Sequence, residues 1–246
     1  TLLAATPALA DLKIGVAAEP YPPFTAKDAS GKWVGWEIDL VDALCAEMKE
    51  KCEIVETAWD GIIPALTASK IDVIIASMAK NAKRREVIDF SNSYYTSAAV
   101  MMGAKNGDMD FSPEHLAGKI IGVQVSTIHA AYAEKYYGKT ATIQTYQTQD
   151  EVNQDLAAGR IDYVLANGTT LDAFLKSTQG GTFEAKGPVP LDVEILGEGA
   201  GAGIRKGDTA LADKLNAALS TLAKDGKLDE ISAKNGLTGL IITPKE

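Results

Sequence analysis

Two polar residues, Ser77 and Asn167, stand at equivalent positions at the ends of two related segments, 60–77 and 150–167. The two segments share an aspartate at the start, a second aspartate near the end and several apolar positions between them. Each segment predicts a helix capped by its first aspartate, a helix end marked by serine or glycine followed by lysine or arginine, and a buried strand that ends at the polar residue. Because ligands of open α/β sheets sit outside the carboxyl ends of the strands, we expect Ser77 and Asn167 to face one shared cleft.

Acid–base chemistry in such a cleft would fall to Glu19 or His129, the only obvious candidates for a general acid or base. A solvated loop charge is the alternative for Glu19, and a solvated helix residue is the alternative for His129. No nucleophile–base constellation is visible, and neither His129 nor the second histidine, His115, lies near the cysteines in sequence. The glycine-rich run 197–207 does not fit a dinucleotide-binding pattern in any register. The sequence therefore predicts no metal and no cofactor.

The elements that must position these residues alternate between strand and helix, which predicts mostly parallel sheets with helices on their faces. Strand patterns at 14–16 and 121–123 precede the two related segments, so we expect two similar α/β lobes. The run 97–102 is the predicted crossover into the second lobe, and the run 197–207 is the predicted return. Helices from about 209 to 234 would then complete the first lobe.

An amphipathic helix is predicted over 36–48, where apolar residues recur on one face. Its acidic residues are interpreted as the solvated side of the helix rather than as a catalytic pair, namely Glu37, Asp39, Asp42 and Glu47. Cys45 lies at the end of this helix, and Cys52 lies just beyond it. A chain that turns back into a strand can bring the two Cα atoms within the ~4.4–6.8 Å that a disulfide needs, and two free thiols are the alternative. Export from the cytoplasm would favour the bridge.

The first ten residues, TLLAATPALA, are apolar and uncharged, and they end in the small-x-small pattern of a signal peptidase site. We interpret residues 1–10 as the remnant of a secretory signal, with a disordered or tag-derived terminus as the alternative. No other apolar run approaches the ~18 residues of a membrane span, so we expect a soluble, exported product. The net charge of −9 argues against nucleic acid as a partner, and 46% apolar residues among 246 permit two ordinary cores.

Several motifs, in order along the chain, resemble those of the family 3 extracellular solute-binding proteins of ABC transporters. They include GWEIDLVDALCAEM at 35–48, AWDGIIPAL at 58–66, KRREVIDFS at 83–91 and AAGRIDYVLAN at 157–167. The resemblance implies a two-lobed periplasmic fold that closes around one small ligand, a polar amino acid or an opine. It also implies an inner-membrane ABC permease as partner, and we expect a monomer. We place lobe 1 at 11–97 and 201–246, and lobe 2 with its crossover strands at 98–200.

The resemblance assigns first-lobe binding residues. Arg84 falls where such proteins hold the ligand carboxylate, which suits a planar guanidinium; a surface arginine beside Lys83 and Arg85 is the alternative. Tyr21 and Trp59 fall on the aromatic positions that sandwich the ligand. The strand end that meets the amino and carboxylate groups corresponds to Ser77 and to the peptide groups of Ala76 and Met78.

The second lobe contributes Thr127 and the backbone N–H of Ile128 at a helix N-terminus, which favours a carboxylate. Within the resemblance, Glu19 and His129 become candidates for further ligand contacts. The chain departs from the family pattern at Asn167, where many amino-acid binders carry an aspartate for the ligand ammonium. The serine or threonine often found at Ala79 and Ile128 is also missing, as is the glycine at Ser126.

The missing aspartate has two interpretations. The ligand is either an N-substituted derivative, as in opines, or a plain amino acid whose ammonium is held by Glu19, backbone carbonyls and the Asn167 amide oxygen. A periplasmic enzyme of the same fold, similar to a dehydratase, is a rival class. A receptor's sensory domain is a third class, disfavoured because the chain ends at ITPKE without a membrane span or signalling helix.

Overall fold

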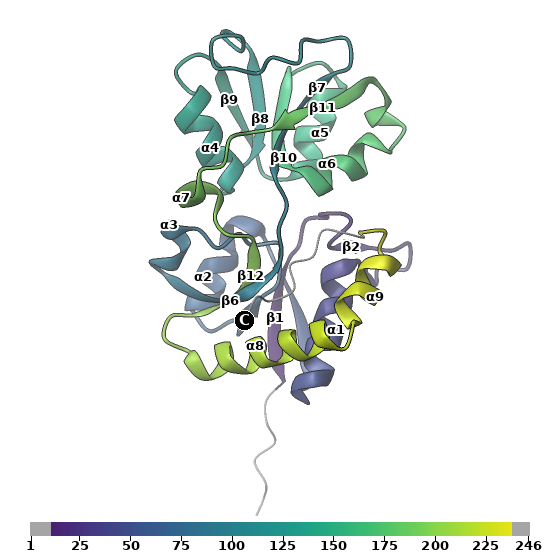
Figure 1. Cartoon of the computed structure of the whole chain (residues 1–246), viewed down its shortest axis with the longest axis vertical. Coiled ribbons are helices and arrows are strands. Elements are labelled where there is room, and N and C mark those ends of the chain that lie inside the picture. The colour runs from purple at the N-terminus through teal and green to yellow at the C-terminus, as the bar shows by residue number, and fades with distance from the viewer. Residues whose placement is uncertain (1–10, 238–246) are drawn as a thin grey trace, which may run out of the picture.

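The computed structural model describes residues 11–237, which form two lobes stacked along the long axis of the molecule (Figure 1). The predicted signal remnant at 1–10 lies outside these residues, as does the end of the chain. Each lobe is built on one five-stranded sheet, and a small hairpin adds β2 (Ala26–Lys27) and β3 (Trp33–Val34). No helix within 11–237 has both the length and the apolar character of a membrane span.

The two sheets have matching strand orders, β4-β1-β5-β12-β6 in lobe 1 and β9-β8-β10-β7-β11 in lobe 2. The lobe 1 strands are β1 (Leu12–Ala17), β4 (Cys52–Thr57), β5 (Val73–Ile74), β6 (Ile88–Tyr95) and β12 (Ala200–Arg205). The lobe 2 strands are β7 (Ala99–Ala104), β8 (Ile120–Gln124), β9 (Thr142–Tyr146), β10 (Tyr163–Asn167) and β11 (Phe183–Pro188). The pairings β1–β4 and β1–β5 therefore correspond to β8–β9 and β10–β8, all parallel. The repeat that the sequence indicated is thus present in the fold.

One strand in each sheet runs against the other four, β12 in lobe 1 and β7 in lobe 2. Each is the first strand after a passage between the lobes: β12 follows α7 (Val193–Leu196), and β7 follows β6. Because these strands start at the cleft while their parallel neighbours end there, they must run in the opposite direction. The prediction of mostly parallel sheets is confirmed, with this one exception in each lobe.

Helices cover both faces of each sheet, as separate buried clusters indicate. In lobe 1 these are α1 (Trp36–Met48), α2 (Ile62–Thr67), α3 (Ala82–Arg85), α8 (Thr209–Lys224) and α9 (Lys227–Lys234). In lobe 2 these are α4 (Ile128–Tyr137), α5 (Gln149–Ala157), α6 (Gly168–Leu175) and α7. Short 3-10 turns, η1 (Trp59–Gly61) and η2 (Gln179–Thr182), complete the elements.

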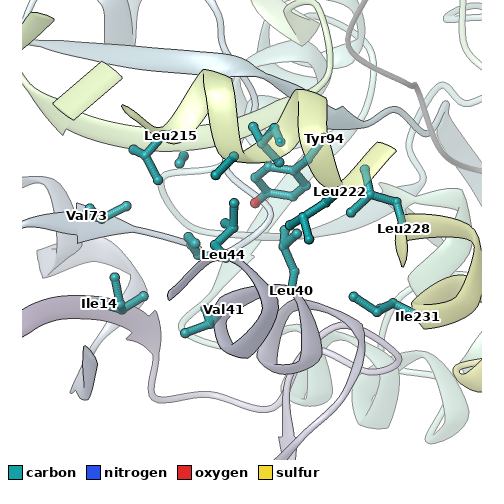
Figure 2. Close-up of a cluster of buried hydrophobic side chains, with 14 of the residues drawn as sticks. Ile14, Leu40, Val41, Leu44, Val73, Tyr94, Leu215, Leu222, Leu228 and Ile231 are labelled. Atoms are coloured by element: carbon teal, nitrogen blue, oxygen red, sulfur yellow. The ribbon is translucent and has the colours of Figure 1, made fainter. Parts of the chain in front are cut away.

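The final helices return to lobe 1, as expected, and pack on α1. Figure 2 shows Leu40 and Leu44 of α1 in one cluster with Leu222 of α8 and Ile231 of α9. Cys45 is bridged to Cys52 with their Cα atoms 6.2 Å apart, so the predicted disulfide is confirmed and ties the end of α1 to the start of β4. The free-thiol alternative is excluded.

Two predictions about helix starts are wrong. Asp60 is not an N-cap, because it lies inside η1, which follows Ala58, and α2 begins after Gly61. In the second segment the cap is Thr148, whose hydroxyl accepts from the Glu151 N–H while the Glu151 carboxylate accepts from the Thr148 N–H. Asp150 lies in the first turn of α5, where its charge suits the helix dipole without capping it.

The interpretation of Glu37 as a solvated residue is also wrong, because its side chain is fully buried. The helix begins after Gly35, whose φ of 121° and close approach to the Phe24 carbonyl exclude a side chain. Glu37 therefore stands in the first turn of α1, pointing inward beneath the cleft. Asp42 and Glu47 are exposed and Asp39 is half-buried, as expected for the polar face.

Candidate ligand-binding site

A cavity of about 320 Å³ lies between the lobes and is lined by residues from both. Ten of the eleven predicted site residues line it: Glu19, Tyr21, Trp59, Ala76, Ser77, Arg84, Thr127, Ile128, His129 and Asn167. The remaining one, Met78, does not, because its side chain is buried in the lobe 1 core and its carbonyl accepts from the Gly201 N–H. The fold therefore brings the predicted residues together from six separate stretches of chain.

Arg84 projects from α3, where the Asn81 side chain caps the helix by accepting from the Arg84 N–H at 3.0 Å. Its guanidinium donates to the Ala79 carbonyl at 3.0 Å and across the cleft to the Ser126 carbonyl at 3.3 Å. Burial lowers the pKa of Arg84 to about 10, so the group stays charged at neutral pH. Among residues 11–237, no carboxylate forms an ion pair with it. A cation held only by carbonyl groups is well placed to receive an anion.

Trp59 forms the other wall of this end of the cavity, with the Arg84 guanidinium carbon 5.3 Å from the ring centroid. Its backbone N–H donates to the Glu19 carboxylate, at 3.1 Å to the nearer oxygen. Its indole Nε1 is buried and has no hydrogen-bond partner. Buried donors are normally paired, so this N–H is an exception among the described residues.

Glu19 and His129 both line the cleft, so neither is a freely solvated side chain. His129 is buried, and burial together with the nearby Arg84 charge lowers its pKa to about 3. The imidazole is therefore neutral in the folded protein across physiological pH. This excludes the solvated alternative for His129 and leaves it as a neutral hydrogen-bonding group.

The second-lobe wall is the N-terminus of α4, capped by Thr127. The Thr127 hydroxyl accepts from the Ala130 N–H at 3.0 Å and donates to the Gln124 carbonyl at 2.7 Å. Ser126, just before the cap, has φ of 59°, a left-handed conformation that glycine adopts more readily. The positive end of the α4 dipole thus faces the same cavity as the Arg84 guanidinium.

Asn167 is committed to two hydrogen bonds within the protein. Its Oδ1 caps α6 by accepting from the Thr169 N–H at 2.9 Å. Its Nδ2 donates to the Tyr95 hydroxyl of lobe 1 at 3.4 Å. One of the two lone pairs of the amide oxygen that was expected to face a ligand ammonium is therefore already used.

Ser77 lines the floor of the cavity, and its side facing away from the cavity is hydrogen-bonded to Glu37. The sequence analysis did not identify Glu37 as part of the site. The carboxylate accepts from the Ser77 N–H at 2.6 Å, from the Ser77 hydroxyl at 3.1 Å and from the Tyr94 hydroxyl at 2.5 Å. A signal was available, since Glu37 precedes Leu40, Val41 and Leu44 by three, four and seven residues. That spacing puts it on the apolar stripe of α1 rather than on the polar face.

The comparisons with known proteins follow this geometry. The bacterial extracellular solute-binding proteins, family 3, match residues 12–238. The chain belongs to this family. It is similar to an L-arginine-binding protein of Pseudomonas aeruginosa, with 38% identity over 91% of this chain and 86% of that one. It is also similar to an octopine-binding periplasmic protein of Rhizobium meliloti, with 38% identity over 78% and 72%.

Among solved structures, an ancestral arginine-binding protein bound to arginine matches with a TM-score of 0.82 and 33% identity, covering 91% of this chain and 97% of that one. These relatives are binding proteins, so this solute-binding protein is not an enzyme. Within 11–237, no cluster of three or more metal-ligating side chains occurs either.

The cleft of this solute-binding protein has an apolar rim that was not predicted. It comes mainly from the return passage to lobe 1, where Pro188, Val189, Leu191 and Leu196 line the cavity. Leu191 stands at the mouth and is 74% exposed. The cavity thus combines one unpaired cation, neutral donors and an apolar lip.

Proposed function

We propose that this protein captures a polar amino acid or amino-acid derivative in the periplasm and delivers it to an inner-membrane ABC permease, acting as a monomer. The observation that carries the proposal is the Arg84 guanidinium, which is charged, faces the cleft and bonds only to carbonyl oxygens. A ligand α-carboxylate replaces these weak contacts with a bidentate ion pair. The N-terminus of α4 adds N–H groups of matching polarity from the other lobe.

The aliphatic part of the ligand lies against the aromatic faces of Tyr21 and Trp59, which line the same cavity. Because carboxylate contacts come from both Arg84 and α4, binding joins the two lobes. We keep the lobe boundaries at 11–97 with 201–246 and at 98–200, and the passages between them are the hinge about which the cleft closes.

Within this class we propose an N-substituted derivative of the opine type as the preferred ligand. Three features support it. The Asn167 oxygen already caps α6 and carries no charge, so residue 167 offers a primary ammonium no ion pair. The apolar lip at Leu191 accommodates added bulk. A relative is named for binding octopine.

Native mass spectrometry of protein purified without added ligand tests the function, because a retained ligand reports its own mass. Calorimetry with arginine, lysine, histidine and octopine then ranks the ligand types. We expect at least one of them to bind at micromolar affinity or better, with octopine ranked first. A ranking led by free arginine or lysine would contradict the opine preference, and no binding of any member would contradict amino-acid capture.

A further inference from the structure

Glu37 places a carboxylate directly behind the wall of the binding cavity. It is fully buried, and its oxygens are contacted by the Ser77 N–H, the Ser77 hydroxyl and the Tyr94 hydroxyl. Within 11–237, no lysine, arginine or histidine forms an ion pair with it. A buried carboxylate without a cationic partner is costly, which calls for a role beyond packing.

The contacts of Glu37 determine what Ser77 presents to the cleft. Ser77 has φ of 52°, a left-handed conformation that costs free energy in a residue with a side chain, and its two bonds to Glu37 hold it there. A serine hydroxyl has one proton and two lone pairs. Because that proton goes to Glu37, the Ser77 Oγ can enter further hydrogen bonds only as an acceptor, and Ser77 lines the cavity.

We propose that Glu37 is the positioning residue for the nitrogen of the ligand. It orients the Ser77 hydroxyl as an acceptor, and its negative charge, one hydrogen bond behind the cavity wall, favours a protonated primary or secondary amine. It acts from beneath the floor of the site in place of the carboxylate that is absent at Asn167. The inference rests on the proposed capture of an amino acid or its derivative.

The surroundings of Glu37 make this charge sensitive to pH. Burial raises the pKa of Glu37 to about 7, while its bonds to Tyr94 and Ser77 lower it only in part. The hydroxyls of Tyr21, Tyr94 and Tyr95 surround it, and burial raises each of their pKa values, that of Tyr21 to about 12. In the cleft itself, the pKa of Arg84 is about 10 and that of His129 is about 3. None of these five groups changes charge near neutral pH.

A cationic nitrogen at Ser77 favours the ionised form of Glu37, so binding at low pH must release a proton. Ligand affinity therefore rises as the pH rises through about 7 and levels off above it. With a pKa near 7 in the empty cleft and a lowered pKa in the complex, the dissociation constant falls about tenfold between pH 6 and pH 8.

The test is calorimetry on wild type and Glu37→Gln with three probes: L-arginine, octopine and 5-guanidinopentanoate, which is arginine without its amino group. Glutamine keeps the shape and an acceptor for the Ser77 N–H, but it removes the charge. At pH 8 we expect Glu37→Gln to weaken arginine and octopine about tenfold and 5-guanidinopentanoate less than threefold. The rise of affinity between pH 6 and pH 8 should vanish in Glu37→Gln and should be absent for 5-guanidinopentanoate.

Glu47→Gln is the matched control, since it makes the same change at an exposed position of α1; it should leave affinity and pH profile unaltered. If wild type binds no probe, the proposed function itself is wrong. If wild type binds but Glu37→Gln loses affinity equally for all three probes, or keeps the pH dependence, Glu37 has only a structural part and this inference is overturned.

A second variant keeps the test decisive if Glu37→Gln does not fold. Tyr94→Phe removes one hydroxyl that lowers the pKa of Glu37. The midpoint of the pH dependence of arginine affinity should therefore move upward relative to wild type. An unchanged midpoint would contradict the assignment of that dependence to Glu37.

Discussion

The side-chain amide of Asn167 joins the two lobes, because its nitrogen donates to the Tyr95 hydroxyl at 3.4 Å while its oxygen caps α6. The residue that most separates this chain from the common family pattern is thus a link across the cleft as well as a cavity residue. Its replacement tests ligand preference without breaking the helix cap, since aspartate caps as well as asparagine.

Asn167→Asp should shift preference toward plain basic amino acids. The new carboxylate pairs with a primary ammonium, but the N-carboxyalkyl group of octopine brings a second carboxylate close to it, and the like charges repel. We expect the ratio of arginine to octopine affinity to rise about tenfold, measured by calorimetry. Asn106→Asp, at an exposed loop position, is the control for the added charge. An unaltered ranking would mean that residue 167 does not face the ligand nitrogen.

Arg84→Ala should weaken binding by roughly two orders of magnitude or more, because an unpaired carboxylate in a closed cleft costs several kcal/mol. Arg84→Lys should recover only part of the loss, since an ammonium cannot make the bidentate contact. The neighbouring Arg85 is exposed and pairs with Glu198 at 3.4 Å, so Arg85→Ala should change affinity less than threefold. Equal losses of affinity in Arg84→Ala and Arg85→Ala would contradict the assignment of Arg84 as the residue that binds the ligand carboxylate.

The buried Glu37 should make stability depend on pH in a defined direction. Its pKa is about 7 in the folded protein and near 4.5 when unfolded, so the folded state holds the proton more tightly. The contribution of Glu37 to the free energy of unfolding is fully present below about pH 4.5 and is lost as the pH rises through 7. The change is on the order of 3 kcal/mol.

Denaturant unfolding of wild type and Glu37→Gln at several pH values measures this directly. The free energy of unfolding of the variant, minus that of wild type, should rise between pH 4.5 and pH 7. His129, with its pKa lowered to about 3, acts in the opposite sense and cancels in the difference. A flat difference would show that Glu37 does not titrate in this range.

Replacing Cys45 and Cys52 by serine should reduce the free energy of unfolding by about 2–3 kcal/mol, because the bridge closes only a short loop. Ligand affinity should stay within a factor of two, since neither cysteine lines the cavity. Unfolding curves and calorimetry on the same sample check both parts. A large loss of affinity would mean that the end of α1 is coupled to the site.

The sequence by itself determined the architecture, because the repeat of 60–77 at 150–167 carries the same apolar pattern twice and so predicts two similar α/β units. Matching strand orders and the convergence of Ser77 and Asn167 on one cavity follow from that repeat. The disulfide was also predictable, since the two cysteines are close in sequence and a helix–strand turn brings them together.

Local capping was less predictable, because several polar residues near a helix start compete for the same N–H groups. Asp60 and Asp150 have the right residue type, yet the backbone begins its turns at Ala58 and at Thr148 instead. Which residue becomes the cap depends on the position and direction in which the chain leaves the preceding strand, and the tertiary structure sets both.

Only the tertiary structure decided the state of the polar groups at the site. Glutamate is a typical surface residue of a helix, but Glu37 is bonded by two residues that are distant in sequence. Ser77 follows β5, and Tyr94 lies in β6. Asn167 likewise becomes a cap and a link between lobes through Thr169 and Tyr95. Desolvation, and with it the charge of a buried group, depends on every neighbour in space, and sequence spacing describes only the neighbours along the chain.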